Sequence, residues 1–144
     1  MIVPDTNLLL YAYDMGSARH REAQTWLDTV FDGEEIIGLP WQVVWAFIRI
    51  STNPRIAVES YGLEQALAIV AGWMCQSRIK LLLPGERHWQ LLKKMLVEGQ
   101  VRGGGVTDAE LAALTIEYGG VLHTTDRDFA RFPGLRWANP LQPS

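Results

Sequence analysis

The sequence predicts an α/β fold, a three-layer sandwich in which a short central parallel sheet is flanked by helices. Short apolar segments of strand length alternate with segments of helical periodicity along the whole chain. The strand segments are almost entirely apolar, as is typical of parallel strands covered on both faces. The chain has 144 residues, no internal repeat and no linker. It is therefore expected to form a single domain over residues 1–144.

The first half of the chain is expected to alternate two strands with three helices. These elements follow one another at residues 1–3, 7–13, 18–31, 36–39 and 41–50. Pro4 stops the first strand because proline cannot donate a hydrogen bond to a sheet. Ser17 is expected to cap the second helix. Pro40 suits the first turn of the third helix, which is apolar nearly all round and should be deeply buried.

The second half of the chain is expected to continue the same alternation. Its elements are predicted at residues 63–74, 80–83, 87–97, 107–118 and 121–124. Thr107 and Glu110 have the spacing of a capping box at the start of the last helix, and Gly119 suits its end. The three glycines at 103–105 lack the following Gly-Lys-Ser/Thr of a phosphate loop and are expected to form a mobile loop.

Composition excludes several classes of protein. The net charge is −3 and the predicted pI is about 5.6, so binding of nucleic acid through bulk positive charge is not expected. Cys75 is the only cysteine, which excludes an internal disulfide and a cysteine zinc site. No apolar run is long enough for a membrane span, and the first residues do not resemble a signal peptide. We expect a cytoplasmic protein that does not enter a membrane.

Four aspartates are placed where a parallel sheet binds ligands. Asp5 follows the first strand and Asp126 follows the last, while Asp108 opens the preceding helix and Asp128 lies two residues beyond Asp126. The carboxyl ends of parallel strands share one edge of the sheet. Carboxylates that meet there repel one another unless a cation lies between them. Mg²⁺ and Mn²⁺ prefer oxygen ligands, so a divalent metal site is predicted.

Each aspartate also has a purely structural interpretation. Asp5 and Asp126 could each cap the helix or turn that follows. Asp108 could favour the dipole of its own helix, and Asp128 could be a solvated surface charge. Taken singly, these interpretations compete with the metal site on even terms. Taken together, the structural interpretations are less favoured, because four aspartates placed at one sheet edge are expected to lie close to one another.

Other polar residues have candidate supporting roles. Four of them flank the aspartates and could hydrogen-bond them: Thr6, Asn7, Thr124 and Thr125. Arg127 and Arg131 are candidates for phosphate contact, with a solvated role equally open. The three histidines (His20, His88 and His123) show no metal-ligand spacing and are expected to be structural. Most of the six tryptophans are expected in the core, with one or two lining a groove.

Five segments in order along the chain form a recognisable set: Asp5-Thr6-Asn7 and residues 39–49, 107–114, 124–129 and 132–137. This set resembles the motifs of PIN-domain ribonucleases, in particular the VapC-like toxins of bacterial toxin–antitoxin pairs. Each motif is short, but the ordered set spans almost the whole chain. The family cuts single-stranded or loop RNA, such as tRNA or rRNA, by metal-assisted hydrolysis. The resemblance therefore implies an endoribonuclease toxin that is neutralised by a VapB-like antitoxin and that forms a homodimer.

The resemblance also implies roles for individual residues. Asp5, Asp108 and Asp126 are implied ligands of Mg²⁺ or Mn²⁺, with Asp128 as a further catalytic ligand or a close auxiliary. Many relatives carry a glutamate in the buried third helix, where this sequence has Ala46. Occupancy of a second metal site is therefore open. The alternative is a degenerate domain that binds RNA or a protein partner without cleaving.

Overall fold

A single parallel sheet runs through the computed structural model, which describes residues 1–141. Within these residues the strand order is β3-β2-β1-β4-β5, and all neighbouring strands are parallel. The strands are β1 (Ile2–Pro4), β2 (Ile37–Pro40), β3 (Ile79–Leu82), β4 (Val121–His123) and β5 (Trp137–Ala138). The predicted α/β sandwich with a central parallel sheet is confirmed. The two-residue strand β5 was not predicted, because it is too short to show periodicity.

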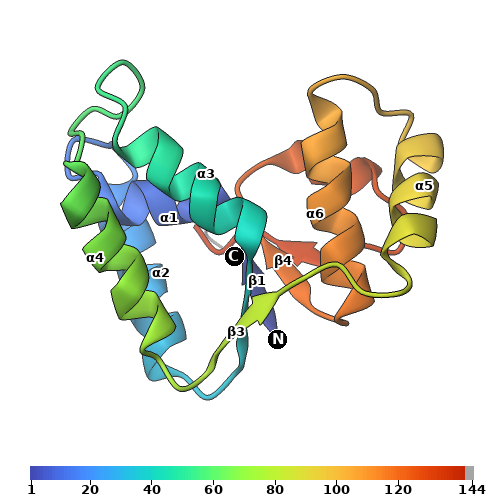
Figure 1. Ribbon diagram of the computed structural model, residues 1–144, viewed down its shortest axis with the longest axis horizontal. Coiled ribbons are helices and arrows are strands. Elements are labelled where there is room, and N and C mark those ends of the chain that lie inside the picture. Colours follow the sequence, from blue (N-terminus) through green and yellow to red (C-terminus); the bar gives the residue numbers. More distant parts are fainter. Residues whose placement is uncertain (142–144) are drawn as a thin grey trace.

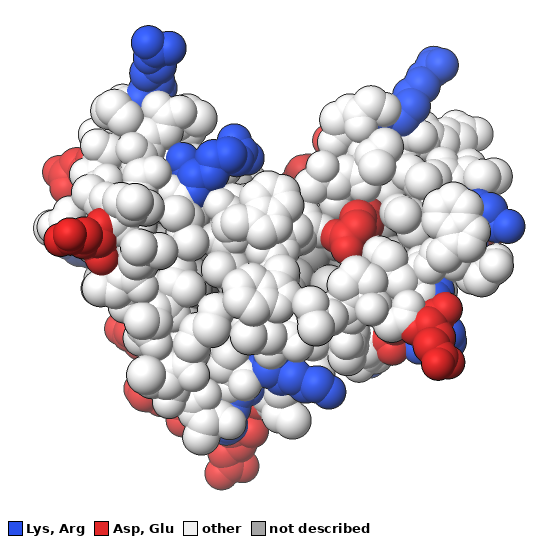
Figure 2. All heavy atoms as spheres, in the orientation of Figure 1, with Lys and Arg blue, Asp and Glu red and all other residues white. Residues whose placement is uncertain are grey.

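Helices cover the sheet in two groups (Figure 1). They are α1 (Thr6–Tyr13), α2 (His20–Asp32), α3 (Trp41–Ser51), α4 (Leu63–Met74), α5 (His88–Glu98) and α6 (Gly105–Glu117), with a 3₁₀ helix, η1, at Arg127–Arg131. α1 packs against α2 and α3, and α5 packs against α6. The surface is notched between the two groups (Figure 2). None of the helices formed by residues 1–141 is long and apolar enough to cross a membrane.

The core joins both helix groups to the sheet. Val3, Leu82 and Leu122 on three of the strands are completely buried. An aromatic cluster joins α1, α3 and α4, with the ring centroids of Phe47 and Trp73 4.7 Å apart. The Trp73 indole N–H also donates to the Tyr13 hydroxyl at 2.9 Å. These contacts fix α3 against its neighbours beside the carboxyl edge of the sheet.

The expectation that most tryptophans lie in the core is wrong. Only Trp26 and Trp73 are buried, whereas Trp41, Trp45 and Trp89 are 41%, 54% and 62% exposed. The third helix is apolar nearly all round, so its sequence does not reveal which face meets solvent. The packing of α3 against the core buries Phe47 and leaves the face that carries Trp41 and Trp45 open.

Two predicted helix caps are also wrong. Ser17 does not cap α2, which begins at His20 after Arg19; its hydroxyl oxygen accepts from the Arg19 N–H at 3.2 Å instead. α6 begins at Gly105, within the expected glycine loop and two residues before the predicted start. Thr107 therefore lies inside the helix, and the Thr107–Glu110 capping box does not form. A Cβ added at position 105 would lie 2.1 Å from Cγ1 of Val101, so any other residue where the helix begins would force the Val101 side chain to shift.

Candidate metal centre

Asp5 is fixed at the carboxyl edge of the sheet by both main chain and side chain. Its N–H donates to the His123 carbonyl at 2.9 Å, which continues the pairing of β1 with β4. One carboxylate oxygen accepts from the Thr6 N–H at 2.8 Å and caps α1. The other accepts from the Thr124 hydroxyl at 2.7 Å. Burial raises the pKa of Asp5, these hydrogen bonds lower it, and the charge of Asp126 raises it further.

Asp126 is held at the same sheet edge by a hydrogen bond to Thr124. The buried Thr124 hydroxyl, which donates to Asp5, also accepts from the Asp126 N–H at 3.0 Å. Asp126 then accepts from the Asp128 N–H at 2.9 Å and caps η1. Both Asp5 and Asp126 thus act as caps. A cap and a metal ligand are compatible roles, because capping orients the carboxylate at a fixed position.

The environment of Asp108 indicates that the four aspartates lie near one another. Asp108 lies half-buried in the first turn of α6. Burial raises its pKa to about 6, and the charges of Asp5, Asp126 and Asp128 contribute to the increase, while Arg131 opposes it. Asp128 itself is exposed on η1. The tertiary fold therefore brings together carboxylates that are up to 123 positions apart in the sequence.

The donor atoms fit a hard divalent cation in chemistry, although their spacing is wider than ligation requires. Within residues 1–141, no group of three or more His, Cys, Asp or Glu side chains is placed to hold a metal ion as it stands. Ligation of Mg²⁺ needs oxygens at about 2.1 Å from one point, whereas charge repulsion acts over several ångströms. Repulsion that raises the pKa of Asp108 is relieved by a bound cation. Because Mg²⁺ is commonly held by one or two carboxylates and several waters, the remaining carboxylates can contact the ion through water.

The remaining predicted site residues differ in burial and in their contacts. Thr6 and Thr125 are half-buried, and Asn7 is exposed at the start of α1. Arg131 donates through Nε to the Gly99 carbonyl at 2.9 Å, which holds its guanidinium near the end of α5. Its charge nevertheless lowers the pKa of Asp108. Arg127 is exposed on η1. Ala46, at the position of the family glutamate, is half-buried on α3 and supplies no carboxylate.

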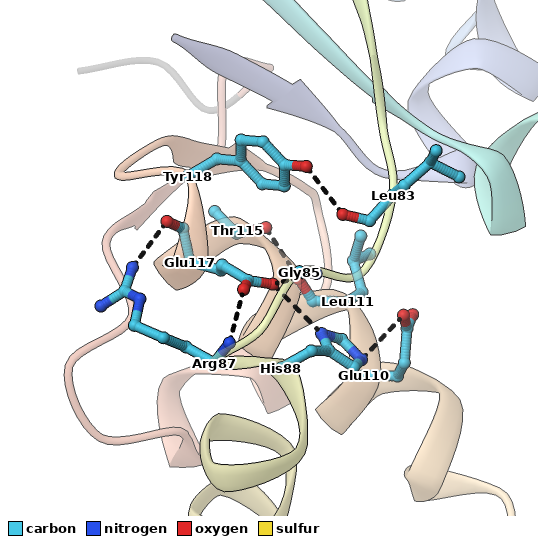
Figure 3. Close-up of polar contacts among 9 residues, drawn as sticks. All are labelled: Leu83, Gly85, Arg87, His88, Glu110, Leu111, Thr115, Glu117 and Tyr118. Carbon is cyan, nitrogen blue, oxygen red and sulfur yellow. Dashed lines mark hydrogen bonds and ion pairs between the residues drawn. The ribbon is translucent and has the colours of Figure 1, made fainter.

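A second polar cluster lies on another face of α6 (Figure 3). His88 Nε2 is 3.3 Å from a Glu110 carboxylate oxygen, and His88 Nδ1 is 3.6 Å from Glu117. Glu117 also accepts from the N–H groups of Gly85 and Arg87 at 3.0 and 3.1 Å. These contacts hold the β3–α5 connection against α6. Sequence reasoning missed this cluster because His88 and Glu110 carry no shared motif.

Comparison with known proteins identifies the family. The PIN domain family matches residues 2–135. Ribonuclease VapC33 of Mycobacterium tuberculosis is 38% identical over 142 residues, which cover 99% of both chains. Ribonuclease VapC37 of the same organism is 34% identical over 140 residues, which cover 97% of both chains. The likeness therefore extends over essentially the whole sequence.

Solved structures agree with this fold. The VapBC2 complex of Rickettsia felis, bound to a DNA fragment from its promoter, matches with a TM-score of 0.70 at 18% identity and covers 96% of this chain and 98% of that one. VapC20 of Mycobacterium tuberculosis, a toxin that cleaves the sarcin–ricin loop, matches with a TM-score of 0.68 at 18% identity and covers 94% of this chain and 99% of that one. The chain is therefore a member of the PIN-domain family and is similar over its full length to the VapC ribonucleases.

Proposed function

We propose that this chain is a Mg²⁺- or Mn²⁺-dependent endoribonuclease that acts as a toxin and is neutralised by a VapB-like antitoxin. The observation that carries the proposal is the geometry of the sheet edge, where the Thr124 hydroxyl donates to Asp5 at 2.7 Å and accepts from the Asp126 N–H at 3.0 Å. The raised pKa of Asp108, to which the charges of Asp5, Asp126 and Asp128 contribute, supports it. Several carboxylates that are costly to keep charged together are typical of a cation site. The full-length likeness to proteins named ribonucleases supports the same activity.

In this proposal Asp5, Asp108 and Asp126 hold the ion, and Asp128 is a further ligand or a close auxiliary. A bound ion supplies an activated water and neutralises charge on the phosphodiester. Thr124 orients Asp5 through its 2.7 Å hydrogen bond and holds the Asp126 main chain at 3.0 Å. The substrate proposed is structured or loop RNA, such as tRNA or rRNA. The sarcin–ricin loop activity of VapC20, a structural neighbour, supports that class.

The activity is tested by incubating purified tRNA and rRNA with the protein in Mn²⁺, in Mg²⁺ and in excess EDTA. Cleavage is expected with either metal and not with EDTA. The Asp126→Asn protein, prepared in the same way, controls for contaminating nucleases. Cleavage that persists in EDTA, or that is equal in the variant, would contradict a metal-dependent site at these residues.

A second function has specific support. Ala46 stands where many relatives carry a glutamate. This difference favours a degenerate domain that binds RNA or a protein partner without cleaving. Such a protein binds RNA equally well with metal and with chelator and never produces fragments, which separates it from a nuclease.

We predict that Ala46→Glu tightens Mn²⁺ binding or raises the rate of RNA cleavage. The added carboxylate would restore the donor that many relatives carry on this helix. Isothermal titration with Mn²⁺ measures the affinity, and a melting curve establishes that the variant folds, because a buried charge without a partner is destabilising. An intact fold with no gain in affinity would show that this position is not a vacated ligand position.

The partner proposal concerns the apolar surface of the first helix group. A cavity of about 420 Å³ lies between α1, α3 and the 56–61 segment, and includes Leu10, Phe47 and Ile56 among its lining residues. Met15 and Val58 nearby are each 70% exposed. Solvent-exposed apolar side chains around a cavity are typical of a protein-binding surface. We propose that an antitoxin segment covers it, as antitoxins accompany toxins in the neighbouring VapBC complexes.

We predict a homodimer in the absence of antitoxin and a larger complex in its presence. Size-exclusion chromatography with light scattering measures the mass directly. The experiment is run over a range of concentrations, because self-association depends on mass action. A particle that keeps the mass of one chain at high micromolar concentration would contradict the dimer.

A further inference from the structure

A second cavity is separate from the candidate metal centre, because none of the four aspartates lines it. It has a volume of about 400 Å³ and lies between α3, the end of β3 and the first half of α6. Trp41, Gln42 and Trp45 line one wall, and Thr107 and Glu110 line the other. Thr107, which lines the cavity, directly precedes Asp108 in the first turn of α6. Acidic atoms lie over α6 at the edge of the surface notch in Figure 2.

Two residues that line the cavity each carry a buried polar atom without a partner. Nε2 of Gln42 and Oε2 of Glu110 are buried and have no hydrogen-bond partner among residues 1–141. The other oxygen of Glu110 faces His88 at 3.3 Å. A buried polar atom without a partner costs free energy. Gln42 on α3 and Glu110 on α6 line one cavity, so the pair is suited to a ligand that carries both an acceptor and a donor.

Exposed aromatic side chains lie on the same wall as Gln42. Trp41 and Trp45 are four residues apart on α3, and so share a face of that helix, and both are more than one-third exposed. Proteins that bind single-stranded RNA stack its bases on exposed aromatic side chains and hydrogen-bond the base edges. Each RNA base presents an N–H donor beside an acceptor, which complements a carboxylate and an amide.

We propose that this cavity binds one unpaired nucleobase of an RNA substrate, stacked on Trp45 and hydrogen-bonded at its edge to Gln42 and Glu110. The inference rests on the proposed ribonuclease function and assigns a subsite to it. The carboxylate of Glu110 repels a phosphate, so the base enters the cavity and the sugar–phosphate backbone stays outside.

The test measures RNA binding separately from cleavage. A fluorescently labelled single-stranded RNA of mixed sequence is titrated with the Asp126→Asn protein in EDTA, and binding is followed by anisotropy. Trp45→Leu in this background is expected to weaken binding about ten-fold or more, because a stacked base contributes strongly to affinity. Trp89→Leu is the matched control, since Trp89 is 62% exposed on α5 and does not line the cavity. It is expected to leave affinity unchanged.

The hydrogen-bonding groups are tested in the same way. Gln42→Leu and Glu110→Gln are each expected to weaken binding about five-fold or more, or to change the preference among oligo(A), oligo(U) and oligo(C). Glu64→Gln, at an exposed position on α4, is the matched control for loss of one negative charge. Melting curves establish that each variant is folded before its affinity is compared.

The outcomes separate the subsite from the function. Equal binding by wild-type and cavity variants, with unchanged cut positions in Mn²⁺, would overturn the subsite while leaving the nuclease intact. Weaker binding by the cavity variants with no cleavage by wild type would support the subsite and overturn the nuclease. A change in the mass of Trp45→Leu by light scattering, without a change in RNA affinity, would assign this face to a second copy of the chain and overturn the proposal.

Discussion

Asp5→Asn and Asp126→Asn are each expected to abolish detectable RNA cleavage while leaving the fold intact. The loss should be at least about a hundred-fold, because even residues that only support a metal ligand are worth about 10- to 100-fold. Asparagine keeps an oxygen that can accept the capping hydrogen bonds from Thr6 and Asp128, so the helix caps survive. An amide is, however, a much poorer ligand for Mg²⁺ than a carboxylate. Initial cleavage rates at saturating Mn²⁺ measure the effect.

The substitution therefore separates the two interpretations of these residues. If Asp5 and Asp126 serve only as caps, the asparagine variants keep full activity. Asp32→Asn is the matched control, because Asp32 is exposed at the end of α2, away from the sheet edge. Thr124→Val should give an intermediate loss of about 10- to 100-fold, since it removes the hydroxyl that orients Asp5. Full metal-dependent activity in both asparagine variants would remove these residues from the site.

Asp108→Asn is expected to stabilise the metal-free protein at pH 7. The pKa of Asp108 is raised from 3.8 to about 6 in the folded protein. A carboxyl group with a raised pKa subtracts stability above that pKa, and the penalty disappears as the pH falls to about 4. At pH 7 the penalty is about 1–2 kcal/mol once solvent screening of a half-exposed group is allowed for. Loss of the favourable dipole interaction at the start of α6 offsets about 0.3–1 kcal/mol of the gain.

Added Mn²⁺ is expected to favour wild type over Asp108→Asn, which is the reverse of the order expected without metal. A ligand that binds only the folded state stabilises it, by about 2.7 kcal/mol at a concentration one hundred times its Kd. Mn²⁺ should therefore raise the free energy of unfolding of wild type and should raise that of Asp108→Asn much less. Urea unfolding of both proteins at pH 4.5 and 7, in EDTA and in Mn²⁺, measures how much Mn²⁺ changes the free energy of unfolding of each protein at each pH. A wild type that does not respond to Mn²⁺, beside a variant with no gain in EDTA, would show that the aspartates form no site.

Sequence alone determined the architecture. The alternation of short apolar strands with longer helical segments sets a parallel sheet, because parallel strands need a crossover that a helix supplies. It also placed Asp5 and Asp126 at strand ends, since each follows directly on an apolar strand and the carboxyl ends of parallel strands lie together. Local patterns were less reliable at helix starts. Ser17 and Thr107 both match capping sequences, yet α2 and α6 begin elsewhere because packing of the apolar faces decides where each helix starts.

Only the tertiary structure decided how side chains from distant segments meet. The raised pKa of Asp108 has burial as its largest cause, and three carboxylates from elsewhere in the chain add to it: Asp5 after β1, Asp126 at the cap of η1 and Asp128 on η1. The contact of His88 with Glu110 and the exposure of Trp45 depend equally on how α5, α6 and α3 pack. Sequence periodicity records which residues are apolar along one element. The distances and burial that set charge, hydrogen bonding and base access arise between elements, and therefore only when the sheet and helices assemble.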